Sequence, residues 1–249
     1  MCTLVIAWQV FADAPVVVAA NRDESVERSS EPPQLLSENP GVVAPRDSEA
    51  GGTWIGYNEF RTFVAITNRW TDTDLAGERS RGLLVRDALE AESAEDAARL
   101  AERAVESDEY EGFNLVVADE NAAILLEWDG HLRVKNLDSG IHVVMNTGEI
   151  GDVTIPDSWP ERSEQQVQNG WKVLEALQPE PSENSEKWLS RGADVLSDHD
   201  YGVCVHHEEF GFGTRSSSLI KIDDEGKATY RFADGPPCRT PFEPVESQI

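Results

Sequence analysis

The first twenty residues constrain the fold more than any other segment, because they contain two short apolar runs separated by a turn. Residues 3–11 are almost continuously apolar, and residues 16–20 consist of valine and alanine alone. Between them, Asp13 and Pro15 favour a turn. Runs that are apolar on both faces and rich in β-branched residues are typical of buried strands. We therefore expect the chain to begin with an antiparallel hairpin that is covered on both faces.

Beyond the hairpin, the hydrophobic patterns predict strands and helices in blocks rather than in alternation. This order argues against a doubly wound parallel sheet and favours an α+β sandwich, with two mostly antiparallel sheets packed together and helices outside them. We expect one domain over residues 1–249, a proline-rich loop at 31–39 and an irregular tail at 236–249. The expected strands are 53–56, 62–67, 113–118, 123–128, 132–136, 142–145, 202–207, 218–222 and 229–232, and the expected helices are 80–91, 93–107, 161–177 and 182–196.

The charge balance excludes two classes of partner. The chain carries 47 acidic and 21 basic residues, which gives a net charge of −26. Nucleic acids and anionic membrane surfaces both need a basic surface, so neither is an expected partner. The acids are spread along the chain, which indicates either general solubility or, as we prefer, a salt-loving host whose high ionic strength screens the repulsion.

The cysteine content and the chain start indicate an intracellular protein. The three cysteines, Cys2, Cys204 and Cys238, form no C-x-x-C pair. Asp13 and Arg22 interrupt the first apolar region, so we expect no signal peptide, and no apolar stretch reaches the length of a membrane span. We expect a cytoplasmic protein with reduced thiols and no membrane span.

The position of Cys2 is the feature that most strongly suggests chemistry. Removal of Met1 would leave one residue with both a thiol and a free α-amino group. The ordinary pKa values of these groups, about 8.5 and about 7.7–8.0, are close enough for the amine to accept the thiol proton. The alternative is that Cys2 is an ordinary small residue at the start of a strand.

The hairpin brings a polar tetrapeptide, residues 21–24, close to this cysteine. If the turn centres on residues 13–14, paired residues sum to about 27, Cys2 lies near Ser25, and the tetrapeptide is one or two cross-strand steps away. Arg22 would then lower the pKa of the thiol, and Asp23 would hold a protonated amine. A slip of one residue exchanges which of the two faces inward, so that point stays open. The alternative is a solvated strand end with an Arg–Asp pair.

Five blocks of sequence together resemble the NRDE family, also called the transport and Golgi organisation protein 2 family. They are Met1-Cys2-Thr3, Asn21-Arg22-Asp23-Glu24, Gly51-Gly52-Thr53-Trp54-Ile55-Gly56, Thr67-Asn68 and Thr214-Arg215-Ser216-Ser217-Ser218. The resemblance covers about residues 1–222. It implies the N-terminal nucleophile hydrolase fold, a four-layer α-β-β-α sandwich. More distantly the chain is similar to choloylglycine hydrolases and penicillin acylases, in which an N-terminal cysteine cleaves a non-peptide amide.

The resemblance also implies roles for single residues. Cys2 matches the nucleophile, and Arg22 and Asp23 lie where the relatives keep an arginine and an aspartate near the thiol. Because the spacing is tighter here than in the bile-salt enzymes, Glu24 is an alternative acid. The remaining candidates are Asn68 and Asn146 as oxyanion donors, Arg215 as a group that orients nucleophile or substrate, and Glu24, Trp54 and Asn114 as substrate-binding residues. Trp54, like Trp70 and Trp128, is also compatible with a core position.

The function expected from these residues is hydrolysis of a non-peptide amide or acyl thioester through an acyl-enzyme on Cys2. The alternative is a non-catalytic carrier of the same fold for an acyl ligand such as acyl-CoA or lipid, or for a haem-like ligand; a scaffold without a small-molecule site is a third class. We expect no cofactor. His199, His206, His207 and Glu208 are candidate metal ligands, but adjacent strand residues point to opposite faces, so we expect no metal site and a core role for Cys204.

Overall fold

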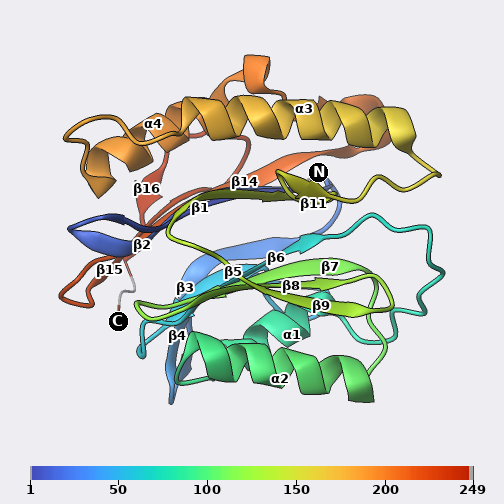
Figure 1. The fold of residues 1–249 in the computed structure, drawn as a ribbon, viewed down its shortest axis with the longest axis horizontal. Helices are drawn as coiled ribbons and strands as arrows, with labels where there is room; N and C mark the ends of the chain where they lie inside the picture. The colour runs from blue at the N-terminus through green and yellow to red at the C-terminus, as the bar shows by residue number, and fades with distance from the viewer. Residues whose placement is uncertain (1, 247–248) are drawn as a thin grey trace.

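The computed structural model describes residues 2–246 and 249, and its architecture is two antiparallel sheets packed face to face between two layers of helices (Figure 1). Helices α1 (Arg81–Ala88) and α2 (Ala94–Ser107) cover the outer face of one sheet, and α3 (Pro160–Ala176) and α4 (Ser185–Ser197) cover the outer face of the other. The predicted α+β sandwich with four layers is confirmed.

The sheet next to α3 and α4 contains the first and the last described strand of the chain. Its strand order is β12 (Asp152–Val153), β11 (Gly148–Glu149), β10 (Gly140–Met145), β1 (Thr3–Phe11), β2 (Ala14–Ser25), β14 (Phe212–Ile222), β15 (Ala228–Ala233) and β16 (Glu243–Pro244), and β13 (His206–His207) also pairs with β14. The sheet next to α1 and α2 has the order β3 (Ser30–Glu38), β4 (Gly41–Asp47), β5 (Ile55–Asn58), β6 (Phe63–Asn68), β7 (Phe113–Ala118), β8 (Ala123–Trp128) and β9 (Leu132–Asn136).

The central position of β1 explains why its sequence is apolar on both faces. Leu4 and Ile6 pack into the core between the two sheets. Val5 and Ala7, which alternate with them, pack into the core beneath α3 and α4. Successive side chains of a strand point to opposite faces, so a strand between two layers needs apolar residues at every position.

The predicted hairpin is confirmed, but its predicted register is wrong. Thr3 pairs with Asn21 and Leu4 with Ala20, so paired residues sum to 24 rather than 27. Two features explain the shift. The turn is one residue earlier than expected, and β1 contains a bulge in which Gln9 has a φ of +54°. The observed register brings the start of the chain closer to residues 21–24 than the predicted register would.

Most predicted elements are present, and the largest error concerns residues 31–39. This segment, expected to be a loop, lies largely in β3. Proline is tolerated there because β3 is the edge strand of its sheet, and its pairing with β4 is interrupted twice. Residues 202–207 were expected to form a strand, but only residues 206–207 pair.

The helix starts follow their capping residues. Ser93 caps α2 by accepting a hydrogen bond from the Asp96 amide, at the start of the helix predicted for residues 93–107. Helix α4 begins three residues later than expected, because Asn184 provides the cap, whereas Ser182 lies before it with a φ of +63°. None of the described helices is long and apolar enough to cross a membrane.

Candidate active site

Cys2 lies directly before β1, at the edge where the two sheets open onto a cavity of about 260 Å³. Its side chain is half-buried, and its Sγ lies 3.7 Å from the backbone oxygen of Asp23 on β2. Cys2, Arg22, Asp23 and Glu24 all line this cavity. The predicted proximity of Cys2 to the tetrapeptide is therefore present, because the end of β2 lies beside the start of β1.

Asn146 holds the backbone nitrogen of Cys2. This nitrogen donates to Asn146 Oδ1 at 3.2 Å. The amide of Asn146 is itself fixed, since Oδ1 also accepts from Gln166 of α3 at 2.8 Å and Nδ2 donates to the Asn68 carbonyl at 2.7 Å. Removal of Met1 would turn the Cys2 nitrogen into the α-amino group. The acceptor that faces it is therefore an amide that cannot rotate freely.

Asp23 is buried beside Cys2 and also lines the cavity. Its side chain is 4% exposed, and its Oδ1 accepts a hydrogen bond of 2.6 Å from the Thr214 hydroxyl on the neighbouring strand β14. Burial raises the pKa of the Asp23 carboxyl, and the Thr214 hydrogen bond opposes that shift. Burial also raises the pKa of the Cys2 thiol; the negative charge of Asp23 acts in the same direction, whereas Arg22 lowers it.

Arg22 points toward the other sheet, as expected for a residue that alternates with Asp23 along β2. Its guanidinium lies 4.1 Å from the centre of the Trp54 ring and 3.8 Å from Glu24. The residue is only 7% exposed, and Nη1 has no hydrogen-bond partner among the described residues. Burial lowers the pKa of Arg22, while Glu24 raises it. A buried guanidinium with a spare donor is suited to an anion or a developing negative charge.

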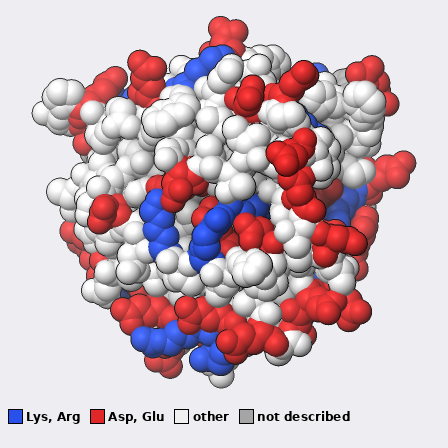
Figure 2. Space-filling view, turned by 45° about the vertical axis from the view of Figure 1, so that its right-hand side comes forward, with Lys and Arg blue, Asp and Glu red and all other residues white. Residues whose placement is uncertain are grey.

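Eight of the 17 described residues that line the cavity are charged. The arginines are Arg22, Arg28, Arg79 and Arg81, and the acids are Asp23, Glu24, Asp47 and Glu111. Several are paired across the wall: Arg28 lies 2.6 Å from Asp47, and Arg81 lies 2.8 Å from Glu111. On the face shown in Figure 2, acidic side chains are scattered widely, whereas Lys and Arg side chains gather near the centre and at the lower edge.

Arg79 and Arg81 are wall residues that the sequence reasoning missed. They flank Ser80, the N-cap of α1, at the end of a long loop after β6. Two arginines within three residues are unusual in a chain with such an excess of acids, and this local reversal of charge is the signal that would have indicated them.

The other predicted site residues divide into two groups. Asn68 and Trp54 line the cavity, and the Asn68 side chain is exposed. Asn146 lies behind Cys2 and contacts its nitrogen rather than the cavity. Arg215 lies at the bulge where β14 leaves its register with β2, and it is not among the described residues that line the cavity.

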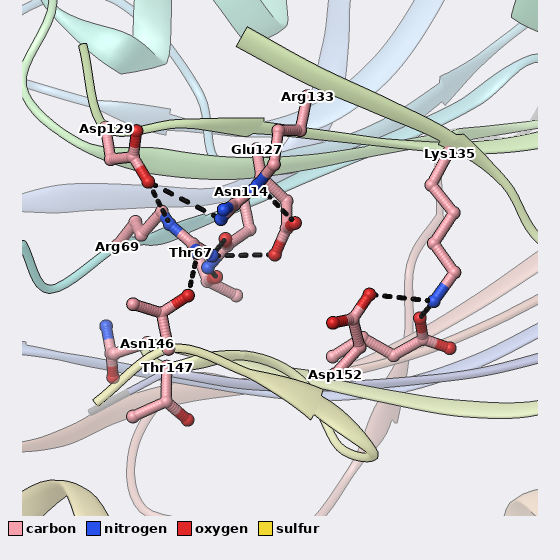
Figure 3. A network of polar contacts seen from close by, with 12 residues as sticks. Thr67, Arg69, Asn114, Glu127, Asp129, Arg133, Lys135, Asn146, Thr147 and Asp152 are labelled. Atoms are coloured by element: carbon pink, nitrogen blue, oxygen red, sulfur yellow. Dashed lines mark hydrogen bonds and ion pairs between the residues drawn. The ribbon is translucent and has the colours of Figure 1, made fainter. Parts of the chain in front are cut away.

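Asn114 is fully buried in β7 and belongs to a polar network instead of the cavity (Figure 3). It accepts a 2.8 Å hydrogen bond from Arg69 Nη1, and its Nδ2 donates to Thr67 Oγ1 and to the Met145 carbonyl. Thr67 also donates to the Met145 carbonyl, at 3.3 Å. Since Met145 directly precedes Asn146, this network fixes the residue that holds Cys2. Asn114 is therefore part of the network behind Asn146. It does not line the cavity, so the substrate contact predicted for Asn114 finds no support.

Comparison with known proteins places this chain in a family. The sequence matches the family described as Transport and Golgi organisation 2 over residues 1–231. The mouse Transport and Golgi organization 2 homolog is 32% identical over 249 residues, and the human homolog is 25% identical over 242 residues; each match covers 86% of this chain and 84% of the relative.

Solved structures of amide-cleaving enzymes share the fold. The N-acylethanolamine-hydrolyzing acid amidase ortholog of Caenorhabditis elegans superposes with a TM-score of 0.59 at 13% identity, over 88% of this chain and 92% of the amidase. Penicillin V acylase from Agrobacterium tumefaciens gives a TM-score of 0.53 at 14% identity, over 94% of this chain and 83% of the acylase. The fold is that of the N-terminal nucleophile hydrolases, and the chain belongs to the Transport and Golgi organisation 2 family.

Proposed function

We propose that the protein is an N-terminal cysteine hydrolase that cleaves a small, polar amide or acyl thioester. The observation that carries this proposal is the position of Cys2, which lines the cavity together with Arg22 and Asp23, while its backbone nitrogen is held from behind by Asn146. An ordinary strand-initial cysteine would not need a fixed amide acceptor for its nitrogen together with a buried arginine beside its sulfur.

In the proposed reaction, removal of Met1 frees the α-amino group of Cys2, which accepts the thiol proton. The sulfur then bonds to the substrate carbonyl carbon. As the C–N or C–S bond breaks, the amine returns the proton to the leaving nitrogen or sulfur, which leaves an acyl-cysteine. The amine next takes a proton from water, whose hydroxide attacks the acyl carbon. The products are a carboxylic acid and the restored thiol.

We assign two groups to stabilisation of the negative oxygen of the tetrahedral intermediate. The Asn68 side chain is exposed to the cavity, and Arg22 presents a buried Nη1 without a partner among the described residues. Asn146 instead orients the amine through its Oδ1. Loss of one such donor typically costs about 3–4 kcal/mol of transition-state stabilisation.

The composition of the cavity wall favours a polar substrate over a lipid or haem-like cargo. Its apolar members are few, chiefly Ala50, Trp54 and Ile66, and four arginines and four acids surround them. Sites that hold drug-sized or larger apolar ligands are mostly lined by hydrophobic residues and are about 300–1,000 Å³ in volume. This cavity is smaller and more polar, which argues against the carrier alternative and for a short acyl or amide group that carries charge.

The test combines intact mass with a substrate screen. We expect the purified protein to lack Met1, and iodoacetamide to add one group at Cys2. In a screen of small amides, acyl thioesters and lactones, the wild type should turn over at least one class, and Cys2→Ala should lose turnover by several orders of magnitude. Cys2→Ser is the matched control, since it keeps a weaker nucleophile in the same place.

Two results would overturn the proposal. One is turnover by Cys2→Ala at the wild-type rate. The other is retention of Met1 in active protein, which removes the free amine from the mechanism. Undiminished ligand binding by Cys2→Ala, with no turnover by the wild type, would support the carrier alternative instead.

A further inference from the structure

We propose that the chain binds a zinc ion at a second site, formed by His199, Cys204, His206 and Cys238. One donor atom from each of these residues lies within 4.8 Å of the other three. Two cysteine sulfurs and two imidazole nitrogens are a common donor set of tetrahedral structural zinc sites. Four protein ligands leave no open position for substrate, so we assign this site a structural rather than a catalytic role.

The distances around His206 are close to those that a metal requires. Its Nε2 lies 3.6 Å from Cys204 Sγ and 3.2 Å from Cys238 Sγ. Tetrahedral zinc with its usual bond lengths places neighbouring donor atoms about 3.3–3.8 Å apart. Since no two donors are more than 4.8 Å apart, the most separated ones need to approach by at most about 1.5 Å. The His199 and His206 rings are 5.2 Å apart at an angle of 78°, so both imidazoles can face one central point.

A contact of His206 with Arg239 must change when the metal binds. The Nδ1 of His206 lies 3.5 Å from Arg239 Nη2, at the limit of a hydrogen bond. With zinc on Nε2, Nδ1 carries the proton and no longer accepts a hydrogen bond. Arg239 is exposed, which leaves its guanidinium room to turn toward solvent.

The local chain geometry brings three separate segments together at this site. His199 begins the short 3-10 helix η1 (His199–Tyr201) after α4, and Gly202, with a φ of +67°, closes that turn. Cys204 and His206 follow two residues apart, so their side chains project to the same side of an extended chain. Cys238 comes from the segment after β15. A metal at this point would tie the C-terminal segment to the loop that follows α4.

The sequence-based expectation of no metal site rested on the adjacent pair His206 and His207. These two histidines do not face one ion, because His207 is exposed and lies outside the cluster. The expectation did not consider Cys204 and His206, which are two residues apart and therefore place two donor groups on the same side of the chain. Cys238 is 32 residues farther along the chain, and only the fold brings it to the other three.

The second site lies directly behind the tetrapeptide of the first. The Val203 carbonyl accepts a hydrogen bond of 2.9 Å from the Asn21 side chain. The Val205 amide donates to the Thr214 hydroxyl, which in turn donates to Asp23. The segment that carries Cys204 therefore supports the strand end that faces Cys2. We infer that zinc stabilises this segment and, through it, the wall of the cavity.

The experiment measures metal content and its sulfur ligation, with no reference to enzyme activity. The full chain is incubated with Zn²⁺ under reducing conditions, dialysed and analysed for bound metal. We expect one zinc per chain in the wild type and close to none in Cys204→Ser or Cys238→Ser. His207→Asn and Cys2→Ala are the matched controls and should retain the metal.

A second readout separates this site from weak binding to the 47 acidic residues. Co²⁺ in place of zinc should give a thiolate-to-metal charge-transfer band in the wild type that Cys238→Ser lacks. A chelator should lower the Tm of the zinc-loaded wild type but not that of Cys238→Ser. Equal metal loss by His207→Asn, a wild type without zinc after dialysis, or a Cys204–Cys238 disulfide in protein kept reduced would each overturn the proposal.

Discussion

Arg22 and Arg69 are both buried among polar groups, yet their surroundings differ in one respect. Arg69 has a side chain 1% exposed and donates to Asn114, Glu127 and Thr154 at 2.7–2.9 Å (Figure 3). Its Nε makes no hydrogen bond among the described residues but lies 3.5 Å from the carboxylate of Asp129. Arg22 is 7% exposed, has one ion pair at 3.8 Å, and keeps Nη1 without a partner among the described residues. Arg69 is held by two carboxylates and does not line the cavity, so it serves the fold, whereas Arg22 presents this spare Nη1 at the cavity and is available to a ligand.

Arg69→Met should give the largest effect, a loss of stability of the fold. This change leaves Glu127 buried without its closest cation, and breaking such a pair costs about 3–5 kcal/mol. Urea unfolding followed by circular dichroism measures the loss. Arg133→Met is the matched control, because Arg133 reaches the same carboxylate at 3.3 Å but is 51% exposed. It should cost about 0–1 kcal/mol. Equal losses in the two variants would contradict the structural role of Arg69.

Arg22→Met should show the reverse pattern, with a small loss of stability and a large loss of function. We expect kcat/KM for any substrate found to fall about 10²–10³-fold, as for the loss of one oxyanion donor. The free energy of unfolding should change by less than about 1 kcal/mol, since Glu24 stays within 4.0 Å of Arg28. Arg22→Lys keeps the charge without the planar fork and should recover only part of the activity. Full activity in Arg22→Met would remove Arg22 from the site.

The chemistry of Cys2 offers a third test, based on pH. Because Asp23 adds to the burial that raises the thiol pKa, Asp23→Asn should shift iodoacetamide labelling of Cys2 to lower pH. Mass spectrometry of labelling rates between pH 6 and pH 10 measures the shift. Asp47→Asn is the control, because Asp47 lines the same cavity but pairs with Arg28 at 2.6 Å. A shift in the opposite direction for Asp23→Asn would show that this carboxylate is not a negative neighbour of the thiol.

The sequence predicted the parts of the fold that depend on local patterns and missed parts that depend on the whole sheet. The strands β1, β7 and β8 were predicted with their observed ends, because continuous apolar runs identify strands covered on both faces. The segment that forms β3 was mistaken for a loop, since two prolines exclude a central strand but not an edge strand. Whether a strand lies at an edge depends on the whole sheet, which local patterns do not reveal.

The candidate site shows the same division. The proximity of Cys2 to residues 21–24 followed from the hairpin even though the register was three residues off, because both strand ends lie at one edge of the sheet. The burial of Asn114 and the arrival of Arg79 and Arg81 at the cavity depend on contacts with segments far away in sequence. Spacing along the chain contains no information on those contacts.

The contact between His142 and Glu149 depends on whether the histidine carries a proton. Its Nδ1 lies 2.6 Å from Glu149, which also accepts from Lys135 at 2.6 Å. Burial acts to lower the pKa of His142, but the hydrogen bonds to Glu149 and to the Asp138 carbonyl, together with the negative charge of Glu149, raise that pKa above its usual 6.5. Burial likewise opposes the lowered pKa of Glu149, which the bonds from His142 and Lys135 produce. A histidine with a raised pKa stabilises the fold fully below its unfolded value and loses that contribution as pH rises through the folded value.

We therefore expect His142→Phe to cost about 1–2 kcal/mol at pH 5.5, where Glu149 is ionised and His142 is protonated. The cost should shrink toward pH 8.5, because the folded histidine loses its proton as pH rises through its raised pKa. Urea unfolding at the two pH values measures this difference. Lys135→Met is the control: its amine stays protonated across the range, with a pKa raised mainly by its hydrogen bond to Glu149, so its smaller cost should be the same at both pH values. A cost for His142→Phe that does not change with pH would show that packing of the ring, rather than its charge, stabilises this edge of the sheet.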